Sequence, residues 1–209
     1  MGPIGYSLLA IRRPEERKMA QPNLLEVDWS KIPAPTDDGA AKHLVGMAIP
    51  PIALRATNDM SVTLSELPGR TVVFAYPRTG EPGKISLVDD WDMIPGARGC
   101  TPQACSFRDL FADLKAAGAK QVFGLSTQDN VYQTEMASRL HLPFPVLSDE
   151  KLALSSALNL PTMGVAGLTL IKRLALIVDD GVITHVFYPV FPPDRNAGDV
   201  LAWLQDNPV

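Results

Sequence analysis

The chain has 209 residues, of which 46% are hydrophobic and 20% are charged, and its formal net charge is -4. This composition is ordinary for one globular domain with a sizeable core. A nucleic-acid partner is not expected, because the charge is negative and no run of Lys or Arg is longer than a pair. No apolar stretch approaches the roughly 20 residues that span a bilayer, so no membrane partner is expected either.

The two cysteines, Cys100 and Cys105, indicate the compartment and the kind of chemistry. The short apolar run at the N-terminus precedes its charges, which is the reverse of the order in a secretory signal. We therefore expect a cytoplasmic protein, in which a close cysteine pair is catalytic or binds a metal. A C-x4-C spacing without a nearby histidine does not suit zinc, so neither a metal nor a cofactor is expected.

Residues 1–45 show little periodicity and contain several prolines and charges. They are predicted to form an extended or poorly ordered N-terminal arm, followed by a single domain over 46–209. Met19 precedes an ordinary polar start, so either Met1 or Met19 fits the initiator.

The first half of the domain contains three predicted strands and one helix. Short strands are predicted over 52–54 and 61–63, and the β-branched and aromatic run at 71–76 predicts a strand buried on both faces. Residues 78–94 are predicted to form a loop. A helix is predicted over 101–117, because Phe107, Leu110, Phe111 and Leu114 recur at helical spacing.

The second half alternates strands and helices before an antiparallel ending. Strands are predicted over 121–125 and 145–147, and helices over 131–140, 151–158 and 197–205. A hairpin is predicted from 170–178 and 182–187, around Asp179-Asp180-Gly181. This order predicts an α/β protein with a central mixed sheet and helices on both faces.

Cys100 lies where the loop enters the predicted helix, and the free N–H groups of a helix start favour a thiolate. A helix terminus usually contributes only about 0.3–1 kcal/mol to an anion, so a cation is also expected. Arg98 is adjacent, but Arg173, on a later buried strand, is the better candidate because strand residues are rigidly placed. The alternative is that both cysteines are inert core residues. Cys100 lies outside the apolar repeat of the helix, which makes this alternative the weaker one.

The segment Gly99-Cys100-Thr101-Pro102-Gln103-Ala104-Cys105-Ser106-Phe107-Arg108-Asp109 resembles the peroxiredoxin Q, or bacterioferritin-comigratory, subfamily of peroxiredoxins. Members of this subfamily typically carry Tyr-Pro, then Thr-Pro-Gly-Cys-Thr, then Gln or Glu-Ala-Cys and Arg-Asp. The likeness extends from Gly46 to about Leu204 and includes Phe74-Ala75-Tyr76-Pro77, Gly124-Leu125-Ser126, Leu147-Ser148-Asp149 and the run that follows Arg173.

The resemblance implies a thioredoxin-like fold and the activity of an atypical two-cysteine thiol peroxidase. In this scheme Cys100 attacks hydrogen peroxide or an alkyl hydroperoxide and becomes a sulfenic acid. Cys105 then resolves it as an intramolecular disulfide, which thioredoxin or a glutaredoxin-like dithiol reduces. Arg173 would hold the thiolate and polarise the peroxide. A monomer or a homodimer is expected.

The sequence departs from the family pattern at the threonine that usually precedes the nucleophile by three positions. Ala97 occupies that position, and Arg98 replaces the usual proline. Pro77 and Cys100 lie 23 positions apart, so about 16 residues are inserted relative to the family pattern. Thr79, at the far end of the insertion, is a candidate to return a hydroxyl to the site; the alternative is a plain turn residue.

Two other functions remain open from the sequence. One is a thioredoxin-fold binding module whose cysteines have lost activity through the altered segment. The other is a peroxide sensor that passes its disulfide to a partner protein.

Overall fold

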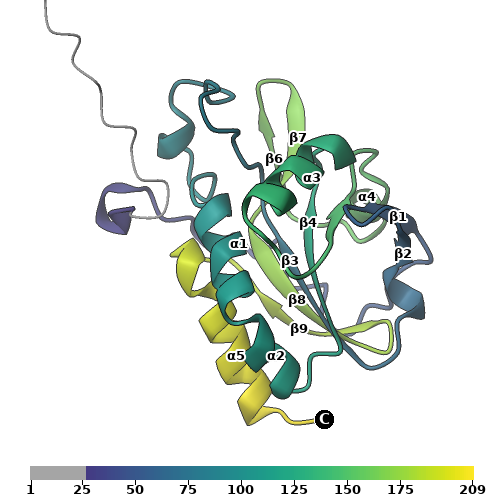
Figure 1. Ribbon diagram of the computed structural model, residues 1–209. Helices are drawn as coiled ribbons and strands as arrows, with labels where there is room; N and C mark the ends of the chain where they lie inside the picture. Colours follow the sequence, from purple (N-terminus) through teal and green to yellow (C-terminus); the bar gives the residue numbers. More distant parts are fainter. Residues whose placement is uncertain (1–26) are drawn as a thin grey trace, which may run out of the picture.

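The structure is a computed structural model that describes residues 27–209, so Met19 and most of the expected N-terminal arm lie outside it. Its centre is a seven-stranded sheet in the order β2-β1-β5-β4-β3-β8-β9 (Figure 1). The strands of this sheet are β1 (Ala53–Ala56), β2 (Ser61–Thr63), β3 (Arg70–Ala75), β4 (Gln121–Ser126), β5 (Val146–Ser148), β8 (Leu174–Asp179) and β9 (Val182–Phe187).

The sheet is mixed, as the sequence predicts. Strand β3 pairs parallel with β4 and antiparallel with β8, and β4 pairs parallel with β5. The antiparallel β8–β9 hairpin turns at Asp180 and Gly181, which both have positive φ. The carboxyl ends of the parallel strands β3 and β4 therefore lie at one edge of the sheet, where α/β folds commonly place their sites.

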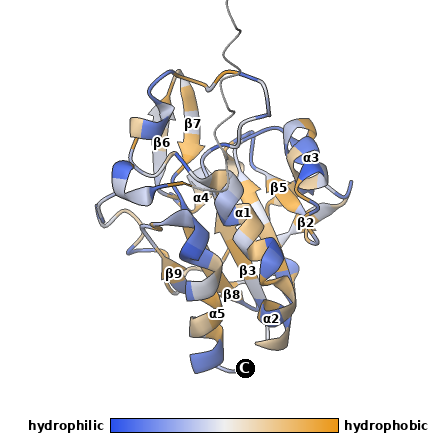
Figure 2. Ribbon diagram, turned by 60° about the vertical axis from the view of Figure 1, so that its left-hand side comes forward, coloured by the Kyte–Doolittle hydropathy of each residue, from blue (hydrophilic) through white to orange (hydrophobic). Residues whose placement is uncertain are grey.

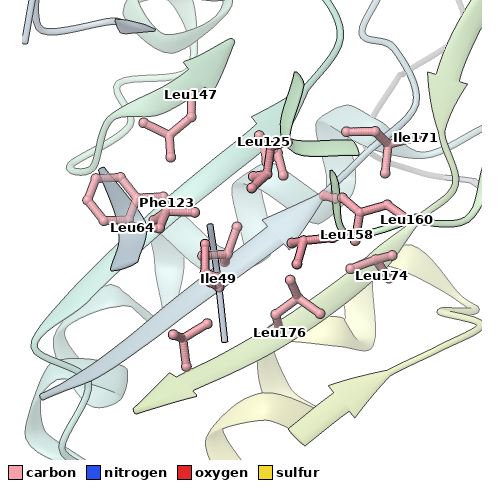
Figure 3. Close-up of a cluster of buried hydrophobic side chains, with 14 of the residues drawn as sticks. Ile49, Leu64, Phe123, Leu125, Leu147, Leu158, Leu160, Ile171, Leu174 and Leu176 are labelled. Atoms are coloured by element: carbon pink, nitrogen blue, oxygen red, sulfur yellow. The ribbon is translucent and has the colours of Figure 1, made fainter. Parts of the chain in front are cut away.

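The core consists of two apolar layers, one on each face of the sheet. Alternate residues of β3 enter opposite layers: Val72 and Phe74 pack on one side, and Val73 and Ala75 on the other. Figure 3 shows the second layer, to which Leu125 of β4, Leu147 of β5, and Leu174 and Leu176 of β8 contribute. Figure 2 shows β3 and β8 as hydrophobic strands in the middle of the molecule. Because β3 is buried on both faces, its residues from Val72 onward form a continuous apolar run.

Helices cover both faces of the sheet. They are α1 (Cys100–Asp109), α2 (Phe111–Ala116), α3 (Asn130–Arg139), α4 (Ala153–Ala157) and α5 (Asn196–Asp206). Helices α1 and α5 lie side by side in Figure 1, and their buried Phe107 and Leu204 belong to the layer that contains Phe74. Leu154 of α4 belongs to the opposite layer. Within residues 27–209, no helix is both long enough and apolar enough to cross a membrane.

Two predicted elements are divided in the structure. The predicted helix 101–117 is two successive helices, because the backbone of Leu110 has φ −97° and ψ 9°, outside the helical range. The predicted strand 170–178 is also two strands. Its first part is β7 (Leu168–Ile171), which pairs with β6 (Thr162–Val165) in a separate two-stranded sheet.

Arg173 was predicted to lie on a buried strand, and this prediction is wrong, because Arg173 lies between two strands. It occupies the bend between β7 and β8, immediately before Leu174. At this bend the chain passes from the two-stranded sheet to the central sheet. Because a residue outside a strand need not point alternately to one face or the other, the Arg173 side chain can turn toward the edge of the central sheet.

The described part of the expected arm makes contacts with the domain. Ala41 and Leu44 are buried in the core, and the Trp29 indole Nε1 donates to the Asp194 carboxylate at 2.8 Å. A short 3-10 helix spans Trp29–Lys31. The division of the chain at residue 45 stays a prediction.

Candidate active site

Cys100 is the first residue of α1, and Gly99 makes the sharp entry into this helix. Gly99 has φ 102°, and a Cβ there would lie 2.6 Å from Pro193 Cγ and 2.7 Å from Trp29 Cη2. Only glycine combines this conformation with such close contacts. The entry places Cys100, whose side chain is almost fully buried, at the helix start, where free N–H groups favour an anion.

Arg173 lies against the cysteine sulfur. Its Nη2 is 3.2 Å from Cys100 Sγ and also donates to the carbonyls of Gly96, Ala97 and Arg98, at 3.2, 3.1 and 3.0 Å. The Arg173 side chain is only 3% exposed, and within residues 27–209 no carboxylate pairs with it. Its neighbours are neutral oxygens and one sulfur. A buried cation without a counter-ion is costly, so negative charge that develops beside this guanidinium is stabilised.

Gln103 and Asn196 hold the arginine from the other side. Arg173 Nη1 donates to Gln103 Oε1, and Gln103 Nε2 donates to Asn196 Oδ1 at 2.9 Å. Both amides are buried. Because Gln103 lies on α1 and Asn196 begins α5, the two packed helices together fix the guanidinium that touches Cys100.

Cys105 lies on the same helix, and both cysteines are free. Burial raises the pKa of the Cys105 thiol above its usual value, while the nearby Arg108 guanidinium acts in the opposite direction. A raised pKa keeps this thiol protonated and poorly nucleophilic at neutral pH. The two cysteines therefore differ in chemistry: one lies against a guanidinium at a helix start, and the other is a buried thiol.

Thr79 shares a pocket with Cys100, but its hydroxyl does not bond to the sulfur. Thr79 Oγ1 donates to Gln128 Oε1 at 3.1 Å, and Thr79 N donates to the same oxygen at 2.9 Å. Gln128 Nε2 donates in return to the Thr79 carbonyl at 3.2 Å. These three bonds fix Thr79 in a buried position and leave its hydroxyl oxygen able to accept a further hydrogen bond.

The pocket over Cys100 has a volume of about 540 Å³. Its wall includes much of the 78–94 segment, which lies above the N-terminal end of α1 in Figure 1. Arg98, the second candidate cation, lines the pocket but donates from Nη1 to both oxygens of Asp92, at 2.9 and 2.8 Å. The structure thus brings Arg173, and not Arg98, into contact with the cysteine. Within residues 27–209, no group of three or more His, Cys, Asp or Glu side chains could hold a metal ion.

Gln128 and Asn196 were not predicted as site residues from the sequence, and Gln103 was predicted only as a part of the family motif. Gln128 follows β4, just as Thr79 follows β3, so its place at the carboxyl ends of parallel strands is a usable signal. Asn196 lies 93 positions from Gln103 and carries no such signal. Its part in the site depends on the packing of α5 against α1.

Comparisons with known proteins agree with this geometry. The redoxin family model matches residues 44–201. The chain is 33% identical over 162 residues to chloroplastic peroxiredoxin Q of Oryza sativa subsp. japonica, and the match covers 77% of this chain and 66% of the rice protein. It is 32% identical over 167 residues to chloroplastic peroxiredoxin Q of Sedum lineare, covering 79% of this chain and 80% of that protein.

Among solved structures, peroxidoxin BcpB of Mycobacterium tuberculosis superposes with a TM-score of 0.63 at 25% identity, covering 79% of this chain and 98% of that chain. This neighbour confirms the thioredoxin-like architecture of the peroxiredoxins that the sequence predicts. The family match covers most of the chain and includes the segment that holds both cysteines and Arg173. The chain therefore belongs to the redoxin family, and within it to the peroxiredoxin Q group.

Proposed function

We propose that the protein is a thiol-dependent peroxidase in which Cys100 is the residue that peroxide oxidises. The observation that carries this proposal is the buried guanidinium of Arg173, 3.2 Å from Cys100 Sγ and without a carboxylate partner in residues 27–209. A thiolate at Cys100 supplies the missing negative charge. Membership of the peroxiredoxin Q group supports the same reaction.

The thiolate sulfur attacks the terminal oxygen of the hydroperoxide. An S–O bond forms and the O–O bond breaks, so Cys100 becomes a sulfenic acid and the peroxide is reduced by two electrons. The leaving oxygen takes one proton and departs as water from hydrogen peroxide or as an alcohol from an alkyl hydroperoxide. The Arg173 guanidinium stabilises the negative charge that moves from sulfur to oxygen.

Thr79 is proposed to replace the threonine that the family places three residues before the nucleophile. The Thr79 hydroxyl already donates its proton to Gln128 Oε1, so its oxygen is free to accept a hydrogen bond from the peroxide O–H. Peroxide bound in this way would lie in the pocket between Thr79 and Cys100, which both line it.

Cys105 is proposed to resolve the sulfenic acid. The Cys105 sulfur attacks the Cys100 sulfur and gives its proton to the departing hydroxyl, so the S–OH bond breaks, water leaves, and an intramolecular disulfide remains. Two electrons from a dithiol such as thioredoxin or a glutaredoxin-like protein restore both thiols. On an intact helix, residues five apart have Cα atoms about 8.7 Å apart, whereas a disulfide needs about 4.4–6.8 Å. The start of α1 must therefore unwind during each cycle.

Stopped-flow mixing of the reduced protein with hydrogen peroxide tests the proposal. We expect rapid, stoichiometric thiol loss in the wild type and none in Cys100→Ser. Thiol loss that survives in Cys100→Ser overturns the assignment of the nucleophile. A wild-type protein that does not react supports the binding-module alternative, and reaction without thioredoxin-driven turnover supports a sensor.

We also propose a cytoplasmic location and a monomer or homodimer. The two free cysteines support a reducing compartment. The plant relatives are described as chloroplastic, so cell fractionation is the measurement that decides between the cytoplasm and an organelle. Analytical ultracentrifugation decides the oligomeric state.

A further inference from the structure

The described part of the N-terminal arm lies against the entry into α1, and Figure 1 shows it in purple beside the start of that helix. A Cβ at Gly99 would lie only 2.7 Å from Cη2 of Trp29. Because Gly99 is buried and has no side chain, the indole meets the backbone that turns into the helix. The redoxin family model begins at residue 44, so this contact comes from a part of the chain outside the family match.

Trp29 is held in place by the 3-10 turn that precedes α5. Its Nε1 donates to Asp194 Oδ2 at 2.8 Å, and its ring meets the Phe191 ring edge to face, with 6.0 Å between the centroids. Pro193, in the same turn, is the other close neighbour of Gly99. A hydrogen bond to a carboxylate is stronger than one between neutral groups. Trp29 and Pro193 therefore cover the entry into α1 together.

The arm is also attached to the bend that carries Arg173. Lys172, the residue before it, donates to Asp38 Oδ2 at 2.6 Å, and the Tyr188 hydroxyl donates to Asp38 Oδ1 at 2.8 Å. The arm thus contacts both elements that bring catalytic groups together, the start of α1 and the bend between β7 and β8. With this second attachment, the segment that holds Trp29 is not free to leave the domain.

We propose that Trp29 is a positioning residue that holds the first turn of α1 in its helical form and so slows the formation of the disulfide between Cys100 and Cys105. The inference rests on the peroxidase function proposed above, because the two sulfurs meet only when this turn unwinds. Unwinding moves Gly99 away from the indole, so the contacts of Trp29 stabilise the helical form alone. Contacts made in only one of two states shift the equilibrium toward that state.

The time that the turn stays helical decides what becomes of the Cys100 sulfenic acid. Until Cys105 arrives, the sulfenate sulfur can attack a second hydroperoxide. A second S–O bond then forms, the O–O bond breaks, the leaving oxygen takes a proton, and a sulfinic acid remains. Trp29 therefore sets the balance between the disulfide and the sulfinic acid.

Acid-quenched mass spectrometry of the full-length protein after mixing with hydrogen peroxide separates the sulfenic acid, the disulfide and the sulfinic acid. In Trp29→Ala we expect disulfide formation to be about tenfold faster, which corresponds to about 1.4 kcal/mol. The first oxidation of Cys100 should stay within about twofold of the wild type, because the helical form remains the major one. The share of sulfinic acid in excess peroxide should fall.

Matched variants distinguish this role from a general loss of stability. Trp29→Phe keeps a ring near Gly99 but cannot donate to Asp194, so its disulfide rate should lie between those of the wild type and Trp29→Ala. Asp194→Asn keeps an acceptor oxygen and should remain close to the wild type. Asp179→Asn is the control, because Asp179 pairs with Arg70 at the end of β3 away from the site. It should change neither rate.

Amide hydrogen exchange of the reduced protein over residues 98–108 tests the same inference without any disulfide, and it should be faster in Trp29→Ala than in the wild type. A wild-type rate of disulfide formation in Trp29→Ala overturns the inference and leaves the peroxidase standing. A parallel fall in both rates also overturns it, because Trp29 would then be merely structural. If the wild type forms a sulfenic acid but no disulfide, the proposed role of Cys105 is wrong, and the exchange measurement alone decides for or against Trp29.

Discussion

At the scale of single residues, the environment of Arg173 separates a catalytic cysteine from an inert one. A buried, inert cysteine needs no cation beside it, whereas here a guanidinium that is 3% exposed lies 3.2 Å from the sulfur. The four acceptors of its Nη2 are the Cys100 sulfur and three backbone carbonyls. Negative charge that develops beside this guanidinium during a reaction is therefore stabilised.

We predict that Arg173→Lys lowers the rate constant of Cys100 with hydrogen peroxide by about a hundredfold, the usual effect of losing one preorganised donor to a transition state. Lysine keeps the charge but cannot reach the sulfur, the carbonyls and Gln103 at once. Stopped-flow kinetics measure the rate, and Arg55→Lys is the control. A rate equal to that of the wild type would remove Arg173 from the site.

The sequence predicts part of the site because its chemistry is concentrated in one segment. Cys100 and Cys105 follow from the motif, and Arg173 follows from the need for a cation. Asn196 could not be predicted in the same way, because it reaches the site through a hydrogen bond to Gln103, 93 positions away. Such contacts depend on how the strands and helices pack, and no local pattern encodes them.

At the scale of elements, the entry into α1 depends on Gly99. We predict that Gly99→Ala lowers the free energy of unfolding by more than about 1–2 kcal/mol, the cost of a left-handed conformation alone. The contacts of 2.6 Å with Pro193 and 2.7 Å with Trp29 add to this cost. Urea denaturation measures the change.

Gly198→Ala is the matched control for this substitution. Gly198 lies within α5, and a Cβ there would meet nothing within 4 Å. Alanine is the better helix former, so this variant should be more stable than the wild type by about 0.5–1 kcal/mol. Equal effects of the two substitutions would contradict the described geometry of Gly99.

Helix α1 must also change during the proposed cycle. We predict that amide hydrogen exchange over residues 98–108 increases when Cys100 and Cys105 form a disulfide, because the first turns of the helix lose their backbone hydrogen bonds. Exchange over α3 serves as the internal reference. An oxidised structure that keeps α1 intact while the disulfide is present would falsify the proposed unwinding.

At the scale of the whole molecule, the central strands were the most predictable elements. The β-branched run at 71–76 predicts β3, and its burial on both faces follows from its continuous apolar sequence. The separate β6–β7 sheet was missed because residues 170–178 read as one apolar run, broken only by Lys172 and Arg173. In the β6–β7 turn, Ala166 has a φ of 48°. Alanine rarely adopts this left-handed conformation, so the sequence did not indicate a turn there.

A partly buried ion pair joins strands β3 and β8 at their ends. Arg70, at the start of β3, donates to both oxygens of Asp179, at the end of β8, at 2.8 and 3.1 Å. These hydrogen bonds lower the pKa of Asp179 below its ordinary value. The stabilisation is therefore present above the ordinary carboxyl pKa of about 3.9 and is lost as the pH falls through the lower folded-state value.

We predict that Asp179→Asn is less stable than the wild type by about 1–3 kcal/mol at neutral pH, because it leaves the buried Arg70 without its anion. The difference should shrink as the pH falls from about 4 through the lower pKa that Asp179 has in the folded state, because the wild-type carboxylate is then protonated as well. Urea denaturation across this pH range gives both values. A difference that stays constant with pH would show that the ion pair is not its source.

The most direct test of the account is a count of thiols before and after one equivalent of hydrogen peroxide. The wild type should change from two free thiols to none. Cys105→Ser should lose its single thiol and gain one oxygen atom on Cys100, located by mass spectrometry of its peptides. If both wild-type thiols persist, or if in Cys100→Ser the oxygen is found on Cys105, Cys100 is not the residue that peroxide attacks.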